Sequence, residues 1–307
     1  MFVKVVSSFM KKRFAVVFLS LIILVIGAFF WFLKIDNKKT EDRLIESKKV
    51  KVAVSFYPLF EFVSQVGKDK VEVFNISFEG ADPHSFEPSA KDIVKIKSSK
   101  LFIFNGAGLD PWAEKLAVQL KKEKVEVVNM AENLKDYLIS DKDDNESYDP
   151  HFWLDPVIAK KEVEIIRDAL IKIDPKNSSF YRENADYYIK KLSLLHQQFQ
   201  KGLFSCEKRG ILVSHAAFSY LAKRYNLTVF SIAGITPFDE PSARRIKQII
   251  EFVKKEKIRY IFFDGLASSK KVKIIAKEAG LKILPLYPIS ALTKKDIKSG
   301  KNYISFI

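Results

Sequence analysis

The sequence predicts an α/β fold of two lobes, each with a mainly parallel four-stranded sheet, joined by one long α-helix. Short β-rich runs alternate with amphipathic helical stretches, and this alternation occurs twice along the chain. A stretch without strand character separates the two sets. With 307 residues, of which 48% are hydrophobic and 29% charged, the chain is long enough to bury a core without disulfides. The single cysteine, Cys206, excludes an intramolecular disulfide and a metal cluster built on cysteines.

Each set is expected to contain four strands with helices between them. In the first lobe the expected strands are residues 51–56, 71–78, 101–104 and 125–129, and the expected helices are 59–66, 90–98 and 111–122. In the second lobe the expected strands are 210–214, 227–232, 258–263 and 282–286, and the helices are 216–224, 241–255 and 270–279. Helical crossovers of this kind connect parallel strands.

Residues 177–204 are predicted to form the connecting helix, because apolar residues recur there at spacings of four, three and four: Tyr188, Leu192, Leu195 and Phe199. The expected organisation of the body is a first lobe (50–176), a linking helix (177–205) and a second lobe (206–307). Residues 1–49, which precede it, are expected to form a cytoplasmic stub, an anchor and a tether, for the reasons given in the next paragraph. Residues 140–148 are acidic and polar without periodicity, which favours a surface loop.

The N-terminal region contains 20 consecutive uncharged, mostly apolar residues, 14–33, with three basic residues directly before them. This length is sufficient for a transmembrane helix, and the basic flank favours an N-terminus in the cytoplasm and a body outside it. A cleaved signal peptide is the alternative; either implies export. The net charge is +15, but beyond residue 50 the basic residues are scattered in lysine pairs without a nucleic-acid motif, so no nucleic-acid partner is expected.

Three of the four histidines follow predicted strands or the loops beyond them: His84, His151 and His215. Open α/β sheets bind ligands at these carboxyl ends. Three neutral imidazoles from separate loops can form one face of a tetrahedral zinc site with an open position, so we predict a metal site in the cleft between the lobes. The alternative for each is a loop histidine bonded to backbone. Asp264, after the strand 258–263, is a candidate further ligand or a helix cap.

From about residue 50 to 307 the chain resembles the substrate-binding proteins of bacterial zinc and manganese ABC transporters, the cluster A-I group. The motifs that carry the resemblance are, in order, Phe56-Tyr57-Pro58, Asp82-Pro83-His84 with Glu87-Pro88, Asn105-Gly106-Ala107-Gly108-Leu109-Asp110-Pro111-Trp112, Asp149-Pro150-His151-Phe152-Trp153-Leu154-Asp155-Pro156, Ser214-His215-Ala216-Ala217-Phe218-Ser219-Tyr220 and Glu240-Pro241-Ser242.

The resemblance implies metal capture between the lobes and delivery to a membrane permease. His84, His151 and His215 fall on the first three ligand positions of the family. The third position is histidine in zinc-type members and glutamate in manganese-type members, so His215 implies Zn²⁺ as the bound substrate, with Mn²⁺ less favoured. A nitrogen-rich site independently favours zinc over the harder manganese.

This sequence departs from the family pattern in three places. The fourth ligand, an acidic residue past the last strand, should fall within residues 286–289, where no carboxylate stands; water or Asp264 would complete the site. The loop before His151 lacks the histidines often found in zinc-type members. Residue 307 comes soon after 302–304, where members usually continue into a closing helix, which implies either looser packing of the second lobe or a longer chain.

The main hypothesis is therefore a monomeric, membrane-tethered, extracytoplasmic zinc-binding protein that delivers its metal to an ABC permease and is not an enzyme. A zinc-dependent hydrolase is one alternative, because three histidines with an open zinc position also occur in hydrolases. The sequence has no HExxH unit, although Asp264 could be nominated as a general base. A surface interaction or metal-sensing protein on the same scaffold is the other alternative.

Overall fold

Residues 49–77, 80–140, 147–239, 241–265, 269–292, 296 and 298–307 are described by the structure, which is a computed structural model. The chain divides into two compact units, Met1–Lys49 and Val50–Ile307, and the description below concerns the second. The predicted membrane anchor, 14–33, lies outside the described residues, as does most of the predicted acidic loop. None of the helices in the described part of the chain has both the length and the apolar character of a membrane span.

The two predicted four-stranded sheets are both present, and every strand pair in them is parallel. The first sheet has the order β2-β1-β3-β4 and consists of β1 (Val50–Val54), β2 (Val71–Asn75), β3 (Leu101–Phe104) and β4 (Glu126–Asn129). The second has the order β6-β5-β7-β8 and consists of β5 (Gly210–Val213), β6 (Thr228–Ser231), β7 (Tyr260–Phe263) and β8 (Lys282–Pro285). The two-lobe α/β prediction is therefore confirmed.

The helices of the first lobe begin where proline or a capping side chain favours a helical first turn. Pro58 lies in the first turn of α2 (Tyr57–Gly67) and Pro111 begins α4 (Pro111–Leu120). Ser89 and Asp92 form a capping box at α3 (Ala90–Lys97). The shorter elements are α5 (Met130–Asn133), η1 (Lys68–Lys70), η2 (Lys135–Tyr137), η3 (Phe152–Leu154) and η4 (Pro175–Asn177).

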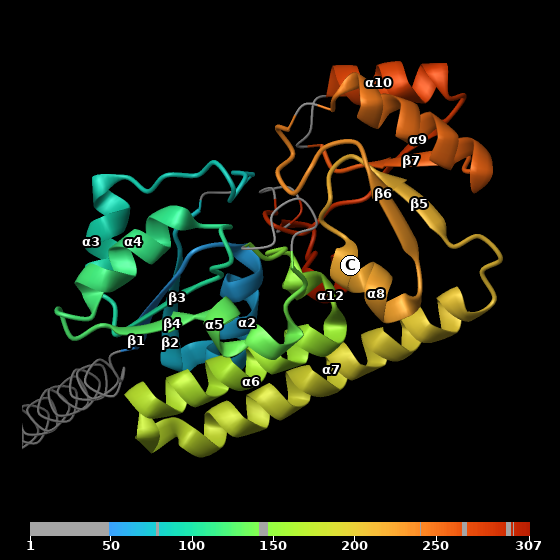
Figure 1. The fold of residues 1–307 in the computed structure, drawn as a ribbon. Helices are drawn as coiled ribbons and strands as arrows, with labels where there is room; N and C mark the ends of the chain where they lie inside the picture. The colour runs from blue at the N-terminus through green and yellow to red at the C-terminus, as the bar shows by residue number, and fades with distance from the viewer. Residues whose placement is uncertain are drawn as a thin grey trace, which may run out of the picture. The chain divides into compact units, whose positions relative to one another are not determined.

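Two long helices follow the first sheet and precede the second in the sequence: α6 (Pro156–Ile173) and α7 (Ser178–Phe204). The predicted connecting helix is α7, which packs against α6 and α2 and also contacts the second lobe (Figure 1). Its apolar face includes the four residues that predicted it, and three of these, Tyr188, Leu192 and Leu195, are buried.

The second lobe contains α8 (Ser219–Tyr225), α9 (Ala243–Lys255), α10 (Ser269–Glu278) and the short α12 (Tyr303–Phe306). The first of these helices begins three residues later than predicted. The backbone N–H of Ala216 donates to the carbonyl of Gly234, and Ala217 donates to His215, so these residues form a turn rather than a helix. This turn determines where His215 lies relative to α8.

The main hydrophobic core draws residues from both lobes, including Phe62 of α2, Tyr188 of α7 and Phe218 just before α8. Separate clusters fill the other face of the first sheet, against α3 and α4, and of the second, against α9 and α10. Tyr303 is fully buried in the main core, with its ring 4.9 Å from that of Phe62, and its hydroxyl donates to the carbonyl of Trp153. The last described residues therefore take part in core packing.

Candidate metal centre

The structure brings the three predicted histidines together from three separate loops. His84 lies in the loop after β2, His151 directly before η3 and His215 two residues after β5. One ring nitrogen from each lies within 4.8 Å of the others, and the Nε2 atoms of His84 and His151 are 3.2 Å apart. In the described part of the chain this is the one group of three or more potential metal-ligating side chains that lie so close.

The same local hydrogen bond fixes the backbone of His84 and of His151. In both loops an aspartate stands two residues before the histidine, with proline between them, and its carboxylate accepts a hydrogen bond from the histidine backbone N–H. The distances are 3.2 Å for Asp82 and 2.9 Å for Asp149. Short polar side chains often bond backbone groups two residues away in turns. The repeated tripeptide thus fixes the backbone from which each imidazole projects.

The His151 loop is also fixed to the first lobe by Asn105. The Asn105 side chain donates to the carbonyl of Pro150 at 3.0 Å, and the carboxylate of Asp110 accepts from the backbone N–H groups of Asn105 and Gly106. Gly106 has φ +74°, and a Cβ there would lie 2.2 Å from the Asn129 side chain. Only glycine fits this close turn without displacement.

Two of the three histidines have a carboxylate on the ring nitrogen that points away from the cluster. Asp149 contacts Nδ1 of His151 at 2.8 Å, and Asp264 contacts Nδ1 of His215. Such contacts fix the tautomer and orientation of a metal-ligating imidazole and leave Nε2 for the ion. For His84 the described residues provide no such partner; its ring nitrogen contacts only His151.

The structure places Asp264, the predicted candidate ligand, behind His215 rather than among the clustered ring nitrogens. Its backbone N–H donates to the Ser214 hydroxyl, and the residue is 3% exposed. Sequence reasoning assigned no role to Asp149, the equivalent partner of His151. The repetition of Asp-Pro-His at residues 82–84 and 149–151 was the signal that could have identified it.

The environment of His84 and His151 favours the neutral form of both side chains. Burial, with smaller effects from the neighbouring His151 and His215, lowers the pKa of His84 to about 2. Burial also lowers the pKa of His151, although Asp149 opposes this shift. Neutral imidazole is the form that binds a divalent metal, so these side chains are ready to bind without first losing a proton.

Aromatic side chains surround the cluster on the first-lobe side. The Trp153 ring lies 5.2 Å from that of His151 and packs edge-on against Phe56. Its indole N–H donates to the carbonyl of Pro288, from the segment after β8. This apolar surrounding excludes water from one side of the site and strengthens electrostatic interactions there.

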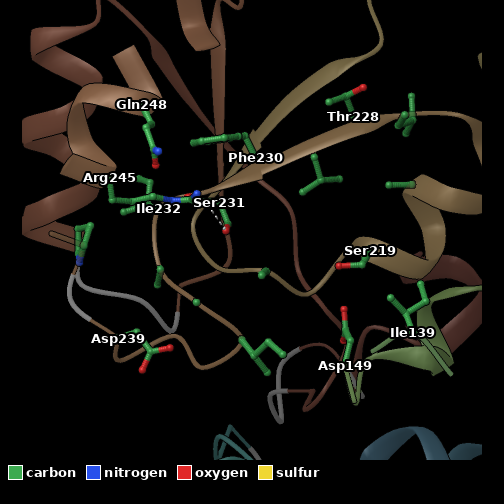
Figure 2. A pocket seen from close by; sticks show the side chains of 18 of the residues that line it. Ile139, Asp149, Ser219, Thr228, Phe230, Ser231, Ile232, Asp239, Arg245 and Gln248 are labelled. Carbon is green, nitrogen blue, oxygen red and sulfur yellow. Dashed lines mark hydrogen bonds between the residues drawn. The ribbon is translucent and has the colours of Figure 1, made fainter. Parts of the chain in front are cut away.

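A cavity of about 920 Å³ is lined mainly by second-lobe residues and by two sequence neighbours of the clustered histidines. Figure 2 shows Asp149 and Ile139 at one end of it and Arg245 and Gln248 at the other, with β6 alongside. Asp149 and Ala216 line the cavity, and they are, respectively, the carboxylate partner of His151 and the residue after His215. The fourth histidine, His196, is elsewhere on α7, where its ring contacts the Tyr225 hydroxyl.

Comparison with known proteins places this chain in a family. Residues 52–307 match the family described as "ZnuA: Zinc-uptake complex component A periplasmic". The zinc-binding lipoprotein AdcA of Streptococcus pneumoniae is 37% identical over 267 residues, which cover 84% of this chain and 53% of AdcA. The high-affinity zinc uptake system protein ZnuA of Bacillus subtilis is 32% identical, with 84% of each chain covered.

Solved structures agree with these sequence matches. The crystal structure of Zn(II)-bound AdcA from S. pneumoniae superposes with a TM-score of 0.74 and 38% identity, covering 84% of this chain and 55% of that one. The Zn(II)-bound ZnuA-like domain of the same protein gives a TM-score of 0.72 and covers 84% of this chain and 94% of that domain. This chain spans about half the length of the AdcA proteins it matches. On its sequence and its fold, the chain belongs to the ZnuA family.

Proposed function

We propose that this protein binds a zinc ion through His84, His151 and His215 and delivers it to an ABC-type importer in the membrane. The observation that carries the proposal is the convergence of one ring nitrogen from each histidine within 4.8 Å. In a tetrahedral site with zinc–nitrogen distances of about 2.0–2.1 Å, the nitrogens lie about 3.3–3.4 Å apart. The Nε2 atoms of His84 and His151, 3.2 Å apart, are already close to this spacing. The AdcA and ZnuA relatives named for zinc binding and zinc uptake support the choice of metal.

Three imidazoles leave one position of a tetrahedral ion open, and we assign that position to water. Asp264 contacts Nδ1 of His215, so its carboxylate and the metal would lie on opposite sides of the same ring. In this proposal Asp264 orients His215 and does not bind the ion itself. A site of three nitrogens favours zinc over manganese, which prefers oxygen ligands.

The same contact weakens the hydrolase alternative. Asp264 was the nominated general base, and its carboxylate is engaged with an imidazole. Membership of a family of uptake-system binding proteins also favours binding over catalysis. We therefore propose a binding protein and not an enzyme.

The location of the protein is proposed from the N-terminal sequence and the relatives. We propose that residues 1–49 include a membrane anchor at 14–33 and a tether, and that the body from residue 50 lies outside the cytoplasm. The body would consist of a first lobe to residue 176, a linking helix to 205 and a second lobe to 307. The relatives described as a lipoprotein and as periplasmic support an extracytoplasmic position at the membrane.

A competition titration with Zn²⁺ and Mn²⁺ tests the proposed binding. We expect one zinc per chain, bound more tightly than manganese, and a rise in thermal stability with added zinc. For an ion that binds only the folded state, the increase is about 2.7 kcal/mol at a free zinc concentration of 100 times Kd. Absence of stoichiometric zinc, or displacement of zinc by equimolar manganese, would refute the proposal.

The carboxylates behind the histidines give a second prediction. Asp149→Asn and Asp264→Asn are each expected to weaken zinc binding by about 10- to 100-fold, because the neutral amide holds and polarises its histidine less well. Zinc affinity from chelator competition is the measurement. Asp186→Asn on the exposed face of α7 is the control and should leave the affinity unchanged. Equal affinity in all three variants would show that the two contacts do not tune the site.

A further inference from the structure

The loop that carries His151 is attached to the second lobe through two side chains of α8. The hydroxyl of Tyr220 donates to the carbonyl of Asp149 at 2.6 Å and accepts the backbone N–H of Ile139 at 3.0 Å. One turn later on the helix, Nε of Arg224 donates to Oδ2 of Asp155 at 2.8 Å. These contacts hold the loop on both sides of His151.

The same helix is closely coupled to His215. It begins at Ser219, four residues after His215, and the intervening residues form a tight turn in which Ala217 donates to the carbonyl of His215. Tyr220 is 2% exposed, and its ring packs edge-on against Phe152, the residue that follows His151. One helix, α8, therefore contacts the loop of His151 and follows His215 closely in the chain.

Both of these α8 side chains have defined partners. The Tyr220 hydroxyl hydrogen-bonds the backbone of both Asp149 and Ile139. These two residues are also paired with each other, because the backbone N–H of Asp149 donates to the carbonyl of Ile139. Arg224 contacts a carboxylate whose other oxygen accepts from the N–H of Val157 and caps α6. A charged hydrogen bond to a fixed acceptor restricts position more than a neutral, mobile contact does.

We infer that Tyr220 and Arg224 are positioning residues of the metal site, which set the place of His151 relative to His215. The inference rests on the proposed function, because it assigns these residues a role in the geometry of that zinc site. Metal binding tolerates errors of only about 0.5 Å in ligand position. Loss of either contact would allow the His151 loop to shift relative to His215, so that the ring nitrogens of these two histidines would no longer be held within 4.8 Å of each other.

A comparison of Tyr220→Phe with Tyr225→Phe tests the inference. Both substitutions remove one hydroxyl from a buried tyrosine of α8, but the Tyr225 hydroxyl contacts His196 on α7, away from the three histidines. We expect Tyr220→Phe to lower zinc affinity by about 10- to 100-fold, as for other groups that orient ligands. We expect Tyr225→Phe to change it by less than about twofold.

The visible absorption spectrum of the Co²⁺-substituted protein separates positioning from a general loss of stability. Changed ligand geometry alters the Co²⁺ bands of Tyr220→Phe, whereas a purely structural role would lower the melting temperature and leave the bands of the folded protein unchanged. Unchanged affinity and bands in Tyr220→Phe would refute the inference for Tyr220. If Tyr220→Phe fails to fold, Arg224→Gln decides by the same two measurements, because Arg224 is partly exposed.

Wild-type protein is measured first so that the two proposals can fail separately. A wild-type protein that binds neither Zn²⁺ nor Co²⁺ would refute the proposed function, and this inference with it. Wild-type binding with the same affinity and spectrum in Tyr220→Phe and Arg224→Gln would refute this inference and leave the proposed function intact.

Discussion

A His215→Ala variant is expected to lose tight zinc binding, with an affinity more than about 100-fold below that of the wild-type protein. For comparison, loss of a group that only orients a metal ligand typically lowers metal affinity by about 10- to 100-fold. Loss of the ligand itself removes a metal–nitrogen bond and leaves the Asp264 carboxylate without its imidazole partner. Chelator competition measures the affinity, and metal analysis after dialysis measures stoichiometry.

His196→Ala is the matched control, because His196 is the remaining histidine of the chain and contacts Tyr225 instead of the cluster. It should retain one zinc per chain with unchanged affinity. Retention of tight zinc by His215→Ala, or equal weakening in the two variants, would contradict a site built on the three clustered histidines. A site that prefers manganese after His215→Ala would be consistent with loss of a nitrogen ligand.

Part of the histidine placement was predictable from topology, although topology applies within one sheet and His84 and His215 follow strands of different sheets. Parallel strands joined by helical crossovers end at the same edge of a sheet, so residues just after several strands meet there. His215, which directly follows the predicted strand 210–214, is the plainest case. The apolar strand runs themselves were recognisable from sequence because both faces of such sheets are covered by helices.

The contacts behind the histidines were less predictable. Asp264 was expected in the cleft, but whether a carboxylate binds a metal or an imidazole depends on side-chain direction, which strand-end position does not specify. The contacts of Tyr220 and Arg224 join residues about 70 positions apart. Neither periodicity nor spacing within one sequence shows such pairs.

The burial of Glu162 could have been found from periodicity. On α6 it occupies the same face as Ile158, Ala159, Val163 and Ile166, all of which are buried. Residues at spacings of three and four share one face of a helix, so a carboxylate in this series is placed in the core. Its position in a charged stretch of the sequence, after Lys160 and Lys161, conceals this.

Glu162 is 0% exposed, and both of its carboxylate oxygens are buried without a hydrogen-bond partner among the described residues. Desolvation by burial raises its pKa well above the ordinary value of 4.5. Between that ordinary value and the raised one, the folded protein holds a proton that the unfolded chain has released. The free energy of unfolding therefore decreases as the pH rises through this range, by about 1.4 kcal/mol for each pH unit.

Glu162→Gln is expected to remove this pH dependence, because glutamine does not titrate. Near pH 5 the variant and the wild type should have similar stability. As the pH rises, the variant should become the more stable of the two, by about 1.4 kcal/mol for each pH unit up to the raised pKa of Glu162. Denaturant unfolding of both proteins from pH 5 to 8 measures the difference. Glu183→Gln on the exposed face of α7 is the control and should follow the wild type throughout. A Glu162→Gln variant whose stability differs from the wild type by the same amount at every pH would show that Glu162 titrates normally, since only a shifted pKa makes the difference depend on pH.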